Sequence, residues 1–300
     1  MEFGRVEKSE LKKINFSLPA DSAQTKKVLS KSKKSAELKI FAGCAKWARP
    51  DWIGSLYPQK TKAADFLREY AKQLNCIEHN AAFYGLPTPQ QIEEWKSKVG
   101  KDFLFCPKFP DTITHLRRLK NVEELLSDFF IFLQDLGKNL GPVFLMPHPQ
   151  MGAKHFETII DFLDLLPTDI DVFVELRNPE WYKKENAAMM FSALEKRKRG
   201  TVITDAAGRR DCVHMNLTTP KAFIRFVGNS LDDSDYSRID EWVQRIKKWS
   251  TAGLKECYFF MHQHDEKYSP YLIKYLIEEL NKHCKLNIKV PHLYDEGLLF

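Results

Sequence analysis

Glu175 and Arg177 are the two residues whose types and spacing point most directly to chemistry. They end the apolar run 172–177, and the sequence Asn-Pro-Glu-Trp follows at 178–181. Residues two apart on a strand share a face, so both side chains would point the same way where a buried strand gives way to a loop. In a closed parallel barrel this position is the floor of the active site. Because a buried acid and base need partners, the pair indicates either a site or a structural ion pair that closes the barrel mouth.

Polar residues also end most of the other strand-like runs. They include carboxylates suited to acid/base chemistry and cations suited to holding an anion or an oxyanion. Each has a structural alternative: Asp205 as a helix N-cap, Glu78 as a partner of neighbouring strands, and the aromatic residues after strands as loop packing. The predicted catalytic residues are Glu175, Glu78 and Asp205. The predicted substrate-binding residues are Arg177, Lys108, Arg225, Asn80, Trp47, Tyr84 and Trp181.

His262 and His264 have the H-x-H spacing that places two imidazoles on one strand face, as in some zinc sites. A catalytic zinc site needs a third protein ligand, which Glu175 or Asp205 would have to supply, and a hydrogen-bond partner for each imidazole. The arginines predicted at the same strand ends would compete for these carboxylates. We therefore predict that the protein binds no metal and no other cofactor.

These residues must be positioned by eight apolar, strand-like runs with helix-like segments between them. Strands that alternate with helices indicate βαβ units and a parallel sheet. Eight such units over about 250 residues are typical of an α/β fold of the (β/α)8 TIM-barrel type. A doubly wound open sheet is the competing fold, but residues 43–47, Gly-Cys-Ala-Lys-Trp, lack its glycine-rich turn. The runs are 38–44, 76–80, 103–108, 142–146, 172–177, 201–205, 222–227 and 257–262.

The positive charge of the chain is concentrated near its start. The net charge is +6, and residues 1–36 hold nine Lys or Arg and four Asp or Glu, so the rest of the chain carries only +1. This segment is rich in Lys and Ser with little periodicity, which predicts a flexible, basic, disordered N-terminal tail over 1–37. A TIM-type barrel over 38–285 and a C-terminal extension over 286–300 complete the predicted organisation.

Other features of the sequence restrict the class of protein. No apolar stretch approaches a bilayer-spanning length and the first residues lack a signal-peptide pattern, so we expect a cytoplasmic protein with no membrane partner. The six cysteines form no CxxC pair, and reduced core cysteines are the default in that compartment. The GxSxG, HExxH, GxxxxGK[ST] and GxGxxG motifs are absent, which removes the common hydrolase, protease and nucleotide-binding signatures.

Several motifs together resemble the domain of unknown function 72 family over residues 38–285. The strongest is Val-Glu-Leu-Arg-Asn-Pro-Glu-Trp at 174–181, and the others fall at 43–47, 52–54, 57–58, 77–87, 108–110, 113–115, 118–119, 140–143, 205 and 223–225. The resemblance implies a TIM-type barrel but no activity, because none is established for the family. The chain departs from the family at 146–149, Met-Pro-His-Pro for the usual Gln-Leu-Pro-Pro, and at His262-Gln263-His264, where asparagines are usual.

Two main classes of function follow from these residues. The leading hypothesis is an enzyme, of the hydrolase or lyase type, that acts on a small or terminal anionic group derived from a phosphate or a sugar. Glu175 would be the base, Glu78 or Asp205 its counterpart, and the cations at the strand ends would hold the anion. The alternative is a non-catalytic nucleic-acid-binding protein, which the basic tail favours and the nearly neutral body opposes. A scaffold protein whose charges merely close the barrel is a third alternative.

Overall fold

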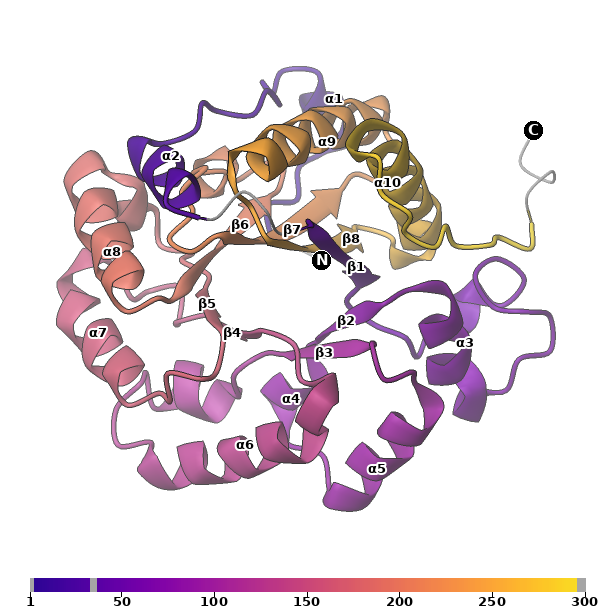
Figure 1. Cartoon of the computed structure of the whole chain (residues 1–300), viewed down its shortest axis with the longest axis horizontal. Helices are drawn as coiled ribbons and strands as arrows, with labels where there is room; N and C mark the ends of the chain where they lie inside the picture. The colour runs from indigo at the N-terminus through magenta and orange to yellow at the C-terminus, as the bar shows by residue number, and fades with distance from the viewer. Residues whose placement is uncertain (1–2, 33–36, 296–300) are drawn as a thin grey trace.

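The computed structural model describes residues 3–32 and 37–295. In this part of the chain, eight parallel strands curl around a common centre and the helices lie outside them (Figure 1). Each predicted strand-like run coincides with one strand. The strands are β1 (Lys39–Cys44), β2 (Cys76–His79), β3 (Leu104–Pro107), β4 (Val143–Leu145), β5 (Val172–Val174), β6 (Gly200–Asp205), β7 (Lys221–Gly228) and β8 (Glu256–Gln263).

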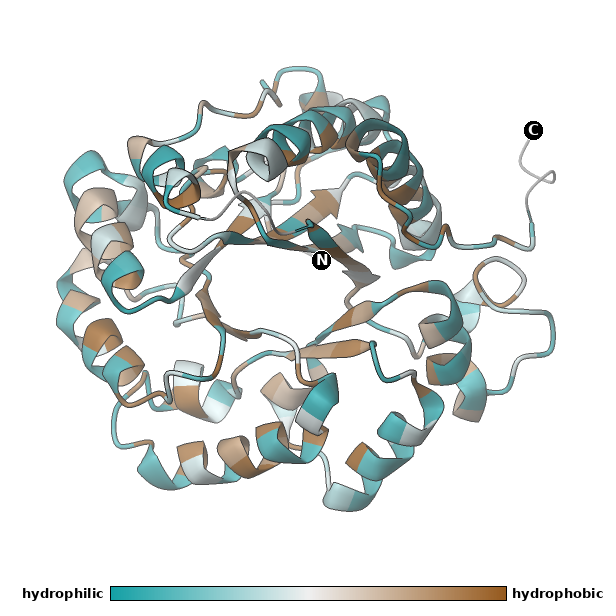
Figure 2. Cartoon of the chain, viewed as in Figure 1, coloured by the Kyte–Doolittle hydropathy of each residue, from teal (hydrophilic) through white to brown (hydrophobic). Residues whose placement is uncertain are grey.

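Helices alternate with these strands and cover the outer side of the sheet. Figure 2 shows hydrophobic residues along strands such as β2 and β3, whereas the outer helices carry both hydrophobic and hydrophilic residues. This distribution is expected for amphipathic helices packed on a buried parallel sheet. The helices are α1 (Lys8–Leu11), α2 (Ala23–Ser30), α3 (Phe66–Gln73), α4 (Ala81–Tyr84), α5 (Pro89–Lys98), α6 (Glu123–Leu136), α7 (Phe156–Asp164), α8 (Lys184–Lys196), α9 (Asp233–Ala252) and α10 (Ser269–Cys284). Among the described residues, no helix combines the length and the apolar character that crossing a bilayer would require.

The strands form a parallel ladder that runs almost completely around the centre. Hydrogen-bonded neighbours follow the order β1-β8-β7-β6-β5-β4, and β2 pairs with β3. Two single parallel bridges, Phe105 with Leu140 and Lys108 with Phe144, connect the β3 side to the β4 side. The fold is therefore an α/β fold whose curled parallel sheet resembles a partial TIM barrel.

The seam between β1 and β2 is closed by a side chain instead of ladder bonds. The Asn75 amide donates to the Ile40 carbonyl (2.9 Å), and its side-chain oxygen accepts from the Ala42 N–H (2.9 Å). The two backbones approach so closely that a Cβ added to Gly43 would lie 2.1 Å from the Cys76 carbonyl oxygen. Only glycine fits at this position of β1.

Aromatic side chains fill the interior of the curled sheet below its carboxyl ends. The ring of Phe223 on β7 lies 5.5 Å from that of Phe144 on β4 and 5.4 Å from that of Phe173 on β5. Residues two apart on a strand share a face, so the next inward residue on β7 is Arg225. Its guanidinium carbon lies 5.3 Å from the centre of the Phe144 ring. The aromatic layer thus forms the floor of a polar layer above it.

The N-terminal segment is folded, so the predicted disordered tail is wrong for residues 3–32. Thr25 and Leu29 of α2 are buried. Asp21, just before α2, accepts a hydrogen bond from Trp249 Nε1 (3.0 Å) and forms an ion pair with Arg245 (2.7 Å), both on α9. Residues 1–2 and 33–36 of that prediction lie outside the described residues.

The prediction failed because the segment carries little apolar periodicity of its own. Its few buried residues, spaced three and four apart as in Thr25, Val28 and Leu29, are enough for one short helix only when α9 supplies the opposing surface. Composition therefore underestimated the order that tertiary contacts impose. At the other end, Leu293 is buried and the His292 N–H donates to Gln73 Oε1 (3.0 Å), so the start of the predicted C-terminal extension packs beside α3.

Candidate functional site

A charged layer lies directly above the aromatic floor, at the carboxyl ends of the strands. It is built by inward-facing positions: Glu78 on β2, Lys108 after β3, Glu175 after β5, Arg225 on β7 and His262 on β8. All five side chains belong to buried residues. Because each lies on or just after a different strand, the fold alone brings them together from distant parts of the sequence.

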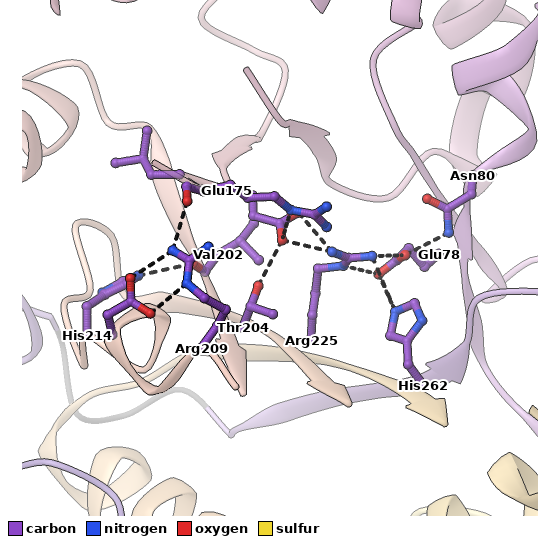
Figure 3. Close-up of polar contacts among 12 residues, drawn as sticks. Glu78, Asn80, Glu175, Val202, Thr204, Arg209, His214, Arg225 and His262 are labelled. Carbon is purple, nitrogen blue, oxygen red and sulfur yellow. Dashed lines mark hydrogen bonds and ion pairs between the residues drawn. The ribbon is translucent and has the colours of Figure 1, made fainter. Parts of the chain in front are cut away.

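Arg225 is the centre of this layer (Figure 3). Its Nε and Nη2 donate to Glu78 Oε2 and Oε1 at 2.7 and 2.8 Å. Its Nη1 donates to both oxygens of Glu175, at 2.9 and 2.8 Å. One guanidinium therefore bridges two buried carboxylates and fixes the distance between β2 and β5. The two carboxylates together raise the pKa of Arg225, even though burial by itself lowers it.

Glu78 has two further contacts besides those from Arg225. Asn80 Nδ2 donates to its Oε1 (2.7 Å), and His262 Nε2 lies 3.1 Å from its Oε2. The other ring nitrogen of His262 lies 3.7 Å from Glu266 Oε1. Burial would raise the pKa of Glu78, but Arg225 and His262 outweigh it and hold the pKa well below its usual range. Burial lowers the pKa of His262, yet Glu78 and Glu266 raise it overall, because both carboxylates favour the protonated ring.

Glu175 is the second ionised carboxylate of the layer. Besides Arg225, Thr204 Oγ1 on β6 donates to Glu175 Oε1 (3.0 Å) and Arg177 Nε donates to the same oxygen (3.1 Å). Burial acts to raise its pKa, but Arg177, Arg225 and Lys108 bring the pKa of Glu175 down to about 2. At neutral pH this carboxylate is ionised, so it accepts hydrogen bonds and donates none.

Lys108 differs from every other charged group of the layer because no carboxylate pairs with it. Its residue is 8% exposed, and its Nζ lies 3.8 Å from the centre of the Phe83 ring on α4. Among the described residues, Nζ makes no hydrogen bond and no ion pair within 4.0 Å. Burial, reinforced by the charges of Arg225 and Arg177, lowers the pKa of Lys108 to about 7. This amine is therefore partly neutral in the physiological range.

Two histidines, His115 and His148, extend from the Phe83 ring that Lys108 contacts, and we call Phe83, His115 and His148 the wall. The His115 ring lies 5.0 Å from that of Phe83 and 5.2 Å from that of His148. Thr114 Oγ1 donates its proton to the Pro110 carbonyl (2.9 Å), so its 2.8 Å contact with His115 Nδ1 is one in which the ring nitrogen donates. In the neutral ring the lone pair is then on Nε2 of His115.

His148 has the opposite tautomer. Its Nδ1 accepts a hydrogen bond from the Gln150 N–H (3.1 Å), which leaves the proton of the neutral ring on Nε2. Burial and Arg118 lower the pKa of His148, while burial, Lys108 and His148 lower the pKa of His115 to about 4. The two rings therefore offer one imidazole acceptor and one imidazole donor, and His115 shares the Phe83 ring with Lys108.

Four of the ten predicted site residues lie elsewhere or only at the rim. Asp205 alternates with Thr204 and points to the helix layer, where it bonds to Arg238 Nη1 (3.0 Å) and Trp242 Nε1 (2.7 Å). Trp181 is buried and donates to the Met151 carbonyl (2.7 Å). Trp47 stacks on His79, with ring centres 5.5 Å apart, and Tyr84 is 80% exposed beside Phe83. The structure brings together the other six: Glu78, Asn80, Lys108, Glu175, Arg177 and Arg225.

Sequence reasoning missed several members of the layer. Thr204 precedes the chosen Asp205 by one residue, and strand alternation could have shown that only one of the two faces inward. Glu266 follows the H-x-H segment and lies outside the strand-like run 257–262. His262 was weighed as a metal ligand, but both its ring nitrogens face carboxylates, whereas His264 lies just after the end of β8. Within residues 3–32 and 37–295, no group of three or more His, Cys, Asp or Glu side chains is placed to hold a metal ion.

The N-terminal segment reaches the same end of the sheet. The Phe3 ring centre lies 4.1 Å from the Arg177 guanidinium and 5.1 Å from that of Arg209. The Gly208 N–H donates to the Gly4 carbonyl (2.8 Å). Residues 3 and 4 thus lie against the loops that follow β5 and β6 and form part of the mouth.

The fold and this layer define a class of protein: an α/β protein with a curled parallel sheet that carries a buried, charged layer at its carboxyl ends. Methylaspartate ammonia lyase from Clostridium tetanomorphum is similar in fold, with a TM-score of 0.51 over 87% of this chain and 62% of that chain. The two sequences are 11% identical, so the likeness shows the fold alone.

The chain belongs to the family described as "Protein of unknown function DUF72", which matches residues 41–293. It is 29% identical over 282 residues to the UPF0759 protein YecE of Escherichia coli (strain K12), which covers 87% of this chain and 100% of YecE. A crystal structure of a DUF72 family protein (EF0366) from Enterococcus faecalis V583 aligns with a TM-score of 0.62 and 18% identity, over 84% of this chain and 98% of that chain. The family resemblance predicted from the motifs is confirmed, and none of these names states an activity.

Proposed function

We propose that the protein is an enzyme with a (β/α)8-type barrel that binds a small molecule through an anionic group at the carboxyl ends of its strands. The observation that supports this is an excess of positive charge. Lys108, Arg177 and Arg225 face only two carboxylates, Glu78 and Glu175, and Lys108 has no carboxylate partner. A phosphate or carboxylate held by Arg177, close to Lys108, would balance this charge. The Asn75 bridge across the β1–β2 seam supports the closed form of the barrel.

The proposed chemistry is acid/base chemistry with divided roles. Glu78 and Glu175 are ionised and hold Arg225, so they are the fixed negative charges of the site. Proton donation falls to Lys108, because a group whose pKa is about 7 exchanges protons most effectively near neutral pH. A purely structural network would not be expected to place a lysine among arginines without a carboxylate partner, since like charges repel.

The proposal is tested by measuring whether phosphate-bearing molecules stabilise the folded protein. We would record the melting temperature with inorganic phosphate, glycerol 3-phosphate and glucose 6-phosphate, each at several concentrations. Because a ligand that binds only the folded state stabilises it by RT ln(1 + [L]/Kd), a concentration of 100 times Kd stabilises by about 2.7 kcal/mol. We expect at least one of these anions to raise the melting temperature of the wild type.

The matched variants are Lys108→Met and Lys46→Met. Both remove one lysine after a strand, but Lys46 is exposed and Lys108 is buried at the site. We expect Lys108→Met to lose the ligand-dependent shift and Lys46→Met to keep it. Equal shifts in the two variants, or no shift with any anion in the wild type, would show that the charge excess serves only the fold.

A further inference from the structure

We propose that Lys108 forms a covalent imine with an aldehyde or ketone that carries a phosphate or carboxylate group. This inference rests on the proposed function, because it is the anionic group that would bring the carbonyl to Lys108. It goes further by naming the carbonyl as the reacting group and the amine as the nucleophile. The argument depends on three features of the wall around Lys108: the isolation of its amine, the surrounding cations and the paired imidazoles.

The first feature is the isolation of the amine. Lys108 Nζ lies 3.8 Å from the centre of the Phe83 ring and 5.9 Å from that of Phe144. Among the described residues no acceptor oxygen holds it as an ammonium ion. A lysine that attacks a carbonyl must be neutral and unshielded, and a lysine tied to a carboxylate is neither.

The second feature is the charge around the amine. Arg225 from β7 and Arg177 after β5 disfavour the ammonium form, whereas Glu175 and Glu78 favour it. His115, from the turn after β3, contacts the same Phe83 ring as Lys108, and its pKa of about 4 makes it neutral at pH 7. Burial and the two arginines together outweigh the two carboxylates, so they favour the neutral amine that imine formation requires. The same cations also suit the anionic end of the substrate.

The third feature is a means of moving protons. The lone pair of Nζ attacks the carbonyl carbon, the carbonyl oxygen gains a proton and the nitrogen loses one, which gives a carbinolamine. Loss of the hydroxyl group as water, after it takes up a second proton, leaves a protonated imine. His115 offers an unprotonated Nε2 and His148 an Nε2–H, so this wall contains both an acceptor and a donor for these transfers.

The test is reductive trapping of the imine. Wild-type protein at pH 7 is incubated with glyceraldehyde 3-phosphate or with unphosphorylated glyceraldehyde, in the presence of cyanoborohydride, which reduces the imine to a stable secondary amine. Peptide mass spectrometry then measures the rate of modification at each lysine. An ordinary lysine with a pKa of about 10.4 is neutral about a thousand times less often at pH 7 than one with a pKa near 7, although its neutral form is more nucleophilic. We therefore expect Lys108 to react at least about tenfold faster than the exposed Lys46.

The two probes separate this inference from the anion site on which it rests. Trapping at Lys108 that prefers the phosphorylated aldehyde and is slowed by excess inorganic phosphate supports both. Equal trapping by both aldehydes, with no effect of phosphate, keeps the nucleophile but overturns the anion site. A phosphate-dependent melting shift without faster modification of Lys108 than of Lys46 keeps the anion site and overturns the imine. Because the readout is a rate at each residue of the wild type, the test does not depend on how Lys108→Met folds.

Discussion

Arg225 joins both buried carboxylates of the mouth, so each of them contributes to stability as well as to the site. Removing one partner of a buried ion pair leaves an uncompensated charge and costs roughly 3–5 kcal/mol. We therefore predict that Glu175→Gln lowers the free energy of unfolding by about this amount in urea titrations. Glu185→Gln, on the exposed side of α8, is the control and should change it by less than about 0.5 kcal/mol. A Glu175→Gln protein as stable as the control would show that the Arg225–Glu175 pair contributes little.

The stability that Glu175 contributes also has a definite pH dependence. Its pKa is about 2 in the folded protein, below the usual value of about 4.3 for an unfolded chain. The unfolded chain therefore takes up the proton first as pH falls, and the contribution is complete above about pH 4.3 and lost as the pH falls toward 2. The difference in unfolding free energy between wild type and Glu175→Gln should shrink over this interval.

Strand alternation explains which single residues could be predicted from the sequence. Glu175 comes two residues after the inward Phe173, and Arg225 comes two residues after the inward Phe223. Both side chains therefore point to the same side of the sheet as these core aromatic residues. The same rule, applied to β6, selects Thr204 and excludes Asp205, which pairs with α9 instead. The unpaired state of Lys108 was not predictable, because it depends on which charges the other strands place around it.

At the scale of elements, the β1–β2 seam leaves no room for a side chain at Gly43. A Cβ on residue 43 would lie 2.1 Å from a backbone oxygen of β2, which no side-chain rotation relieves. We predict that Gly43→Ala destabilises the protein by about 1–3 kcal/mol or more, since overpacking here forces two backbones apart. Gly100→Ala is the matched control, because an added Cβ there meets no atom within 4 Å. Similar unfolding free energies for the two variants would mean that the seam opens without cost.

The eight strands were predictable because each is a short apolar run bounded by polar or turn residues, and the helices between them have clear apolar spacing. The N-terminal helices were not predictable on this basis. Lys27 and Lys31, which looked like part of a solvated basic tail, each lie 3.5 Å from Glu195 on α8. These two lysines form ion pairs within the fold, which weakens the hypothesis that the segment is a free, basic arm that binds nucleic acid.

At the scale of the whole molecule, residues 3–32 act as a strap that links the outer helices to the mouth. Leu29 is 2% exposed, Asp21 pairs with α9, and Phe3 lies on Arg177 at the site. The strap therefore contributes to the folded state as other packed elements do, although its composition is that of a tail.

We predict that a variant lacking residues 1–32 loses stability and unfolds at a lower urea concentration than the full chain. Fully burying one aliphatic side chain stabilises by about 1.5–3 kcal/mol, and this segment buries Leu11, Val28 and Leu29. Leu29→Ala isolates part of the effect and should cost about 2–5 kcal/mol, whereas the exposed Lys26→Ala should be nearly neutral. A truncated protein with unchanged stability would show that this segment behaves as a free tail that contributes nothing to the fold. If stability falls, any loss of nucleic-acid binding on truncation reports on folding first, and only point variants of the exposed lysines can then test an electrostatic arm.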